Sequence, residues 1–524
     1  MTAPSPAIQK LSIVGRTRVE ALRKDYVLVG HDILELLTQA MYVEPLTIYR
    51  EYVQNAADAI EEARRQRMYG PNEAGRVDVH IDLPERAIRI RDNGASIPCG
   101  LFVRRLLAIG QSDKRGKGLR GFRGIGRLAG LGYCQEVVFR GRAEAREPVT
   151  EVTWSARKLR ELLNSEWPIH DLQTAVSEIA TVNRTSGGSW PPRFFEVELR
   201  KVLRIKNDVL LNPDAVQEYL SQVAPVQFKK DFDFGDRIET FLQKHGVGEA
   251  IAIAIDGNTI VWRPHQSRFA LTPKIDDAFR EIQFNEIPSI EGGLDAVGWV
   301  LDHSYLGALP KSLNVGGLRL QSGNIQIGGT DILADLFSEP RFNSWCVDEF
   351  HILNKKILPN GRRDNFEHSV HYVNFQSHVS KIATELSRTC RARSGSRNLV
   401  KATTQTLQKI ETDLNIVRSV PHNFPFRQTQ VETLRESINK QQAKVEKHWP
   451  QSAQRGALLK QVLELRRKLD RTSSKRTKKA LFERLAPAKK KAYSDVFSAI
   501  YEATEDLSIA HELVRKIFKR LCRK

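Results

Sequence analysis

Apolar and polar residues alternate along several stretches of the first 200 residues and predict strands there. Residues 77–90 alternate about a proline-containing turn and predict two strands, and residues 137–139 and 194–199 predict later strands of the same sheet. Residues 26–60 instead repeat at helical spacing, with an apolar face in residues 33–37. Because helices and strands each bury one face here, we expect a layered α/β sandwich, with one mixed or antiparallel sheet under helices.

The pattern divides the chain into three regions. We expect an N-terminal α/β domain over residues 1–205, a second α/β domain over residues 206–390 and a helical region over residues 391–524. The strands expected in the second domain are 250–255, 260–262, 296–301 and a pair within 318–328.

The helical region contains a short coiled-coil seam. Leu458, Val462, Leu465 and Leu469 follow a 4-3-4 spacing. Only about two heptads are sustained, so packing within a helical hairpin is favoured over a free dimer zipper.

The net charge of +19 comes almost entirely from this last region. Residues 391–524 contain 31 Lys and Arg against 13 Asp and Glu, a net charge of +18, whereas residues 1–390 contain 50 against 49. A basic region is typical of nucleic-acid binding, because Lys and Arg release the counterions condensed on phosphates. A solvated helical surface or an acidic protein partner would give the same composition.

Three polar residues lie at helical spacing in the segment 51–59. Glu51, Asn55 and Asp58 occupy positions i, i+4 and i+7, which places them on one face of a helix. If this face is buried, its charges need a partner, because an unpaired charge taken out of water is costly. A nucleotide with its metal ion is one candidate, and an ordinary solvated helix face is the alternative.

A strand that ends in a polar turn follows. Charged and apolar residues alternate in residues 87–91, and Asp92-Asn93-Gly94 then ends the strand with turn-forming residues. An aspartate at a strand end can accept a hydrogen bond from an exocyclic amine such as that of adenine. An ordinary hairpin turn would have the same sequence.

Glycine and cationic residues are concentrated in residues 116–129, which lead into an apolar run. Glycine lets backbone N–H groups approach an anion closely, and the N-terminus of a following helix adds its positive end. The segment lacks the Gly-Lys-Ser/Thr spacing of the Walker phosphate loop. It is either a phosphate-binding loop of another kind or a flexible surface loop.

These three segments, in this order and spacing, resemble the GHKL ATPase superfamily, which includes heat-shock chaperones, gyrase B subunits, MutL, MORC proteins and sensor histidine kinases. The resemblance covers about residues 25–205 and implies a Bergerat-type fold that binds ATP and Mg²⁺. It implies that Glu51 is the general base that activates water, that Asn55 holds Mg²⁺ and that Asp58 is a supporting polar group of the pocket.

The resemblance also implies the other nucleotide contacts. Asp92 would bind the adenine amine, and Gly94 would allow the base to approach closely. Residues 109–114 resemble the lid segment of MORC-like members, which adds Ser112 and Lys114 as nucleotide contacts. The glycines that would cradle the phosphates are Gly121, Gly124 and Gly126.

One position departs from the family pattern, which usually has a second glycine two places after Gly94. Here that position is Ser96, which makes the turn stiffer or shifts the adenine. The segment 95–125 is glycine-rich and cationic, and it suits a lid that closes over the triphosphate and gates turnover.

The second domain resembles the transducer or middle domain of these ATPases, which lends a cation to the γ-phosphate. The candidate cations are Lys311, Arg319, Arg362 and Arg363, and their spacing does not separate them. A Pro-Asn-Gly turn at residues 359–361 presents the last two, either as an interdomain switch or as a local cluster of salt bridges.

The order of the domains favours an ATP-hydrolysing conformational clamp, in which ATP closes the lid and pairs two copies as a homodimer. A protein client or a nucleic acid would bind through the basic region. A sensor histidine kinase is disfavoured, because its ATPase module follows a phosphoacceptor domain and only about 25 residues precede the module here. A nucleotide-gated nucleic-acid-binding protein with little turnover is the alternative.

Cysteine and hydropathy patterns bear on the compartment. The five cysteines are scattered without a CxxC pair, which predicts neither a disulfide framework nor a zinc site and is typical of reduced thiols. No apolar run reaches the roughly 18 residues of a membrane span, and the N-terminus lacks a signal-peptide pattern. We therefore expect a cytoplasmic protein without a membrane partner.

Overall fold

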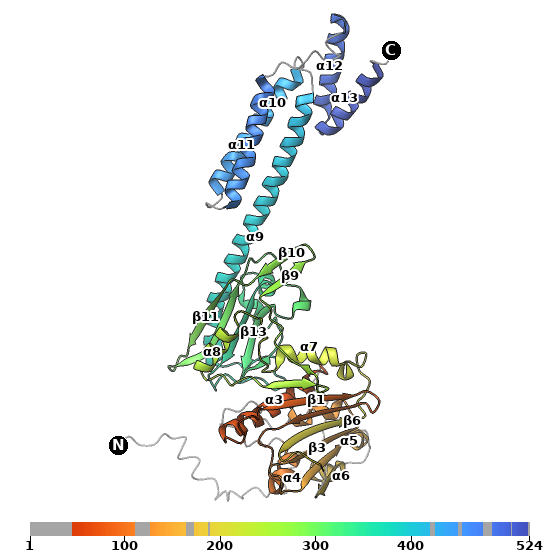
Figure 1. Ribbon diagram of the computed structural model, residues 1–524, viewed down its shortest axis with the longest axis vertical. Helices are drawn as coiled ribbons and strands as arrows, with labels where there is room; N and C mark the ends of the chain where they lie inside the picture. The colour runs from red at the N-terminus through yellow and green to blue at the C-terminus, as the bar shows by residue number, and fades with distance from the viewer. Residues whose placement is uncertain are drawn as a thin grey trace, which may run out of the picture. The chain divides into compact units, whose positions relative to one another are not determined.

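The chain separates into two compact units, Met1–Arg388 and Thr389–Lys524 (Figure 1). The computed structural model describes residues 44–109, 126–163, 172–186, 189–419, 425–448, 453–474, 485–504 and 506–521.

The first unit contains a mixed sheet in the strand order β5-β4-β3-β6-β2-β1-β7-β8. Neighbouring strands are antiparallel except for β1 and β7, which are parallel. The mixed sheet expected from the alternating pattern is therefore confirmed. The strands are β1 (Arg76–Asp82), β2 (Ala87–Asp92), β3 (Glu136–Arg142), β4 (Val149–Ser155), β5 (Ala180–Thr185), β6 (Phe194–Arg200), β7 (Ala252–Ile255) and β8 (Thr259–Ile260).

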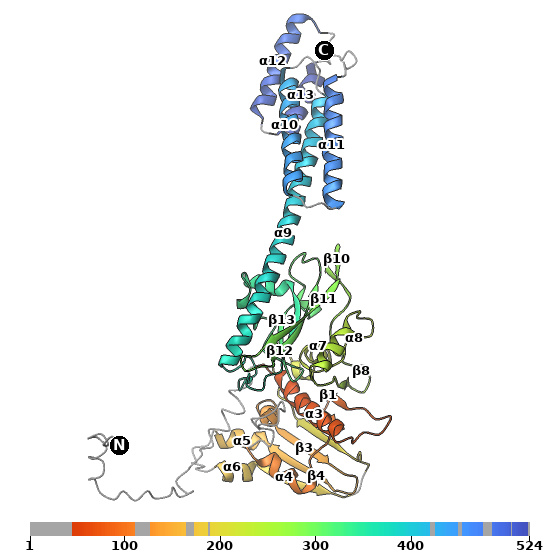
Figure 2. The same cartoon turned by 90° about the vertical axis from the view of Figure 1, so that its left-hand side faces the viewer.

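One face of this sheet is apolar and packs against helices. Ile48, Val53 and Ile60 of the first helix are buried in one core with strand residues such as Val79 and Ile90, because the helix repeats every 3.6 residues and the strands every two. Figure 2 shows α3 beside β1 and α4 beside β4. The helices of this layer are α3 (Thr47–Arg65), α4 (Cys99–Leu107), α5 (Ala156–Leu163) and α6 (Leu172–Ile179).

The strands expected at 250–255 and 260–262 belong to this first sheet and not to the second domain. β7 pairs with β1 from Arg76↔Ala252 to Val79↔Ile255, and β8 pairs with β7. Ile253 and Ile255 are buried in the first core. These apolar side chains complete the core beside β1. Their burial favours the pairing of β7 with β1, although the two strands are far apart in the sequence.

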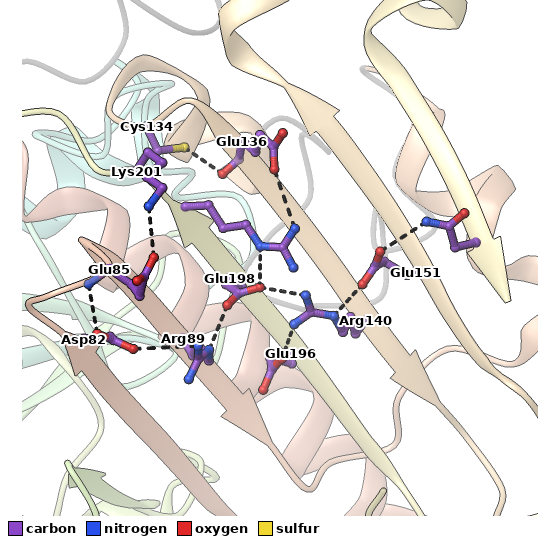
Figure 3. A network of polar contacts seen from close by, with 12 residues as sticks. Asp82, Glu85, Arg89, Cys134, Glu136, Arg140, Glu151, Glu196, Glu198 and Lys201 are labelled. Atoms are coloured by element: carbon purple, nitrogen blue, oxygen red, sulfur yellow. Dashed lines mark hydrogen bonds and ion pairs between the residues drawn. The ribbon is translucent and has the colours of Figure 1, made fainter. Parts of the chain in front are cut away.

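The opposite face of the first sheet carries a ladder of ion pairs (Figure 3). The Arg140 guanidinium on β3 contacts Glu196 at 2.8 Å and Glu198 at 2.6 Å on β6, and it also contacts Glu151 at 2.5 Å on β4. Arg89 on β2 contacts Glu198 from the other side at 2.8 Å. Acid and base face each other across adjacent strands, which stabilises the sheet register.

Arg140→Met is expected to lower the free energy of unfolding by roughly 3 kcal/mol at pH 7, because Glu196 and Glu198 are buried and lose their shared partner. Burial alone would raise the pKa of Glu198, but hydrogen bonds from Arg89 and Arg140 outweigh it and lower the pKa from 4.5 to about 2. The stabilisation from this carboxylate is therefore present above pH 4.5 and is lost as the pH falls toward 2.

The loss in free energy of unfolding caused by Arg140→Met should therefore be smaller at pH 3 than at pH 7. Chemical unfolding of the variant and the wild type at both pH values measures it. The control is Arg157→Met, whose exposed pair with Glu161 is worth less than about 1 kcal/mol. An equal loss in free energy of unfolding for Arg140→Met at the two pH values would contradict the role of ionised Glu198 in stabilising the fold.

A second sheet follows in the same unit, in the order β11-β12-β15-β13-β14. β13 and β15 are parallel, and the other pairs are antiparallel. The two strands expected about the Ser-Gly-Asn turn are confirmed as β13 and β14. The strands are β11 (Glu281–Pro288), β12 (Leu294–Asp302), β13 (Gly317–Ser322), β14 (Ile325–Ile327) and β15 (Val347–Ile352), with a separate hairpin of β9 (Arg268–Thr272) and β10 (Ile275–Ala278).

Two helices precede the second sheet, α7 (Pro213–Val223) and α8 (Gly235–Lys244). Asn212 caps α7 by accepting from the amides of Asp214 and Ala215 at 3.0 and 3.2 Å, and Pro213 occupies its first turn. α7 contacts both α3 and β14, so it connects the first helical layer with the second sheet.

The second unit is helical, as expected. The helix α9 (Val370–Ser419) crosses the boundary between the units, and the others are α10 (Pro425–His448), α11 (Ala453–Ser474), α12 (Pro487–Ala503) and α13 (Leu507–Leu521). The four seam residues of α11 are buried in a core that includes residues of α9 and α10, which confirms packing between helices of one chain. Among the described helices, none is both long and apolar enough to cross a membrane.

Candidate functional site

The polar stripe of α3 is buried. Glu51 and Asp58 each expose only 3% of their surface, and Asn55 is partly buried. The alternative of a solvated helix face is therefore wrong for the two carboxylates. The helix forms as the pattern predicts, and its stripe is covered by segments that are distant in the sequence.

The first of these segments is the short helix η3 (Gly126–Gly132). A Cβ built on Gly126 would collide with Oε2 of Glu51, so only glycine allows this approach without displacing the carboxylate. Tyr52 fixes the segment from the next position of α3, since its hydroxyl accepts from the Gly130 amide at 2.9 Å and donates to the Arg127 carbonyl at 3.2 Å. The last glycine of the expected phosphate loop therefore lies directly at Glu51.

The second segment is the turn Asp92-Asn93-Gly94 at the end of β2. Asp92 is buried, and its Oδ1 accepts from the Gly94 amide at 2.9 Å. A Cβ on Gly94 would lie 2.5 Å from the carbonyl carbon of Ala59, so this glycine lets the turn pack against the backbone of α3. The Ala95 amide then donates to the Ala59 carbonyl at 2.9 Å. The turn is thus held one helical position beyond Asp58.

Ser96 occupies the position where the resembled family usually has glycine. Its φ is +53°, in the left-handed region where a side chain is strained and glycine is favoured. The Ser96 hydroxyl donates to the Phe194 carbonyl at 2.7 Å, which offsets part of that cost. The backbone conformation that favours glycine is therefore kept here with a serine.

The third segment is the turn 359–364, which follows the last strand of the second sheet and reaches Glu51. The Nε of Arg363 lies 3.5 Å from Oε1 of Glu51, and Nη2 of Arg50 lies 3.7 Å from the same atom. Arg50 also donates to the carbonyl oxygens of Arg362 and Arg363 at 3.3 and 3.4 Å. A buried carboxylate thus meets two guanidinium groups, one from its own helix and one from the turn 359–364.

The structure separates the four cations that the sequence left open. Arg363 is at Glu51, whereas Arg319 is buried among Gln222, Gln326 and the Asn314 carbonyl. Lys311 and Arg362 are exposed. The Pro-Asn-Gly turn contacts α3 through Arg363, and its role as an interdomain switch stays a prediction.

Neither a known protein-family model nor a curated protein sequence matches this chain. The case for a function therefore rests on the residues of the site and their geometry.

Several expected residues fall outside the described part of the chain, namely Ser112, Lys114, Gly121 and Gly124. The lid segment 95–125 is described only up to residue 109, where α4 buries Phe102 and Leu106 in the core. Its first part is therefore a packed helix.

Within the described residues, no cluster of three or more His, Cys, Asp or Glu could hold a metal ion.

The sequence analysis missed Arg50 and Tyr52. Both belong to the same helix as Glu51, and both are buried, at 7% and 2% exposure. An arginine directly before a buried acid could have been noticed as a potential ion pair. Tyr52 gave no such signal, because its partners are backbone groups of η3 that sequence spacing does not reveal.

Proposed function

We propose that this chain binds and hydrolyses ATP as a conformational clamp of the GHKL type, similar to the chaperone, MORC and MutL members. The observation that carries the proposal is the environment of Glu51. This buried carboxylate meets a glycine of the expected phosphate loop and Arg363 of the turn 359–364, which follows the second sheet. A solvated or purely structural helix face would not need both.

Each residue has a role that fits its chemistry. Glu51 would accept a proton from the attacking water, which a carboxylate within hydrogen-bond reach can do. Asp92 would accept a hydrogen bond from the adenine amine, with Gly94 leaving room for the base and Asp58 as a supporting polar group. Gly126 would present its backbone amide near the phosphates, together with Gly121 and Gly124.

Asn55 would hold Mg²⁺, which supplies charge neutralisation at the phosphates. The donor set fits this ion, because Mg²⁺ prefers oxygen ligands and usually keeps several waters and substrate phosphates. One amide oxygen on the partly buried face of α3 is sufficient for such a site.

The clamp part of the proposal concerns the link between the two sheets. The turn 359–364 touches Glu51, so a change at the nucleotide would alter a contact of the second sheet. Closure of the lid and pairing of two copies would follow ATP binding, and hydrolysis would reverse both. Arg363 would place its charge near the γ-phosphate, since it already lies beside the proposed base.

The direct test measures ATP binding by calorimetry and phosphate release by the full chain, with and without Mg²⁺. We expect saturable binding and slow, Mg²⁺-dependent release. Absence of ATP binding at millimolar nucleotide would refute the proposal. Binding without any release would favour the nucleotide-gated alternative.

A second candidate function is nucleic-acid binding by the helical unit, favoured by its charge. Residues 389–524 contain 31 Lys and Arg against 13 Asp and Glu, and Lys489 and Lys491 at the start of α12 are exposed. We expect the dissociation constant for a DNA duplex to rise steeply with salt, with a slope set by about 0.9 per phosphate contact. Binding that is absent at low salt, or insensitive to salt, would exclude this role.

A further inference from the structure

A continuous series of contacts joins a buried arginine of the second sheet to Glu51. We propose that Arg319 and Gln326 are positioning residues, which hold the turn 359–364 so that Arg363 reaches Glu51. The inference rests on the proposed ATPase function, and it gives Arg319 a role other than the γ-phosphate contact that the resemblance implies.

The series begins at Arg319 on β13. Its Nη1 donates to Oε1 of Gln326 on β14 at 3.1 Å, and its Nη2 donates to the Asn314 carbonyl at 2.6 Å. Gln222 at the end of α7 is a third partner, with its Oε1 at 3.4 Å from Nη1. One guanidinium therefore ties β13, β14 and α7 together.

Gln326 continues the series toward the site. Its Nε2 donates to the Gly328 carbonyl at 3.1 Å, and the Gly328 amide donates to the Arg363 carbonyl at 2.9 Å. A Cβ on Gly328 would lie 2.7 Å from the carbonyl oxygen of Asp364, so the two backbones are in close contact. The side-chain amide of Gln326 thus fixes the residue that holds Arg363.

The backbone of Arg363 shows that its turn is held from outside. Its φ is +57°, a left-handed conformation that costs a non-glycine residue about 1–2 kcal/mol. Such strain persists where surrounding contacts determine the backbone. The contacts here are the Gly328 amide on one side and the Arg50 guanidinium on the other, both on the Arg363 carbonyl.

Arg319 is a charged residue in a buried position, where desolvation is unfavourable. It exposes only 3% of its surface, and burial lowers its pKa to about 10 although the charge of Glu349 opposes this. Glu349 forms its ion pair with Arg263, at 2.7 Å, whereas the Arg319 partners given above are uncharged oxygens. Apolar residues of similar volume are often as stable as buried ion pairs, so stability alone does not account for Arg319.

A second route from Arg319 leads to the same helix. Gln222 lies on α7, and α7 packs against α3. Arg319 therefore restrains the surroundings of Glu51 through α7 and through the turn 359–364. Only the route through the turn 359–364 passes through Gln326.

Gln326→Glu tests the route through the turn 359–364. A glutamate keeps an acceptor for Arg319 but has no N–H to donate to the Gly328 carbonyl. We expect kcat for ATP hydrolysis to fall about tenfold, with KM and ADP affinity within about twofold, because small misplacements of a catalytic group cost 10–100-fold. The amide of Gly328 should exchange faster in hydrogen exchange. Gln326→Met, which loses both contacts, is the second variant if the glutamate impairs folding.

The control is Gln321→Met, a buried glutamine opposite Gln326 that takes no part in the series. Its kcat should stay within about twofold of the wild-type value. A double-mutant cycle decides the route, because residues acting through one another are not additive. In an Arg363→Met background, Gln326→Glu should lower single-turnover hydrolysis no further.

Two results would overturn the inference. One is an unchanged kcat in folded Gln326→Glu and Gln326→Met. The other is an equal loss in the wild-type and Arg363→Met backgrounds, which would indicate a general structural role. A wild-type chain that neither binds nor hydrolyses ATP would instead refute the proposed function, so the two failures are distinct.

Discussion

Glu51→Gln is expected to lower kcat for ATP hydrolysis at least about 100-fold and to leave ATP affinity within about threefold. A general base contributes 10²–10⁴-fold, and glutamine cannot accept the proton. The change keeps the shape of the side chain, so Gly126 retains its neighbour. The loss of the charge beside Arg50 and Arg363 is expected to favour an anionic ligand slightly.

The measurement combines steady-state phosphate release with ATP binding by calorimetry. Glu61→Gln is the matched control, because Glu61 is on the same helix but exposed, and its kcat should equal that of the wild type. Asn55→Ala should instead mainly weaken Mg-ATP binding and affect kcat less. Hydrolysis by Glu51→Gln at the wild-type rate would show that another group is the base.

The strands of the fold could be predicted because their pattern is local. Residues 77–90 alternate in sequence and form β1 and β2, with Val79 opposite Ile90 on the buried face. Partner choice was less accessible to sequence reasoning. β7 at 252–255 pairs with β1 across more than 170 residues, because Ile253 and Ile255 complete the first core. Spacing alone assigned this strand to the second domain.

The burial of the polar stripe could not be decided from sequence. Glu51, Asn55 and Asp58 have the same spacing on a wet helix as on a buried one. The difference depends on Gly126, which is 75 residues further along the chain, and on Arg363, which is more than 300 residues away. Such contacts are properties of the tertiary fold.

The choice among the four cations had the same limit. Arg319 and Arg363 are both arginines in the second domain, and nothing in their spacing reveals their partners. Arg319 is surrounded by acceptors from β14, α7 and the segment before β13. The Arg363 side chain is instead 15% exposed and points at Glu51. Local environment, not residue type, separates a positioning arginine from one that can meet a ligand.

Arg363→Met is expected to lower kcat about 100-fold, with a smaller effect on ADP affinity than on ATP affinity. Removing a single preorganised donor at a developing negative charge costs 10²–10³-fold, and arginines near a transferred phosphoryl group contribute at least as much. ADP lacks the γ-phosphate, so it should not depend on this guanidinium. Stability should fall less than for Arg140→Met, because the buried Glu51 keeps Arg50 as a cationic neighbour and its pair with Arg363 is 3.5 Å long.

Two further variants separate the effect of the Arg363 guanidinium from that of its charge. Arg362→Met removes the neighbouring exposed arginine and should leave kcat within about twofold, which controls for net charge. Arg363→Lys keeps the charge but loses the planar fork of donors, so an intermediate kcat is expected. A rise in kcat for Arg363→Met would reverse its assigned role, because it would mean that the ion pair restrains Glu51 and that hydrolysis requires the turn 359–364 to move away.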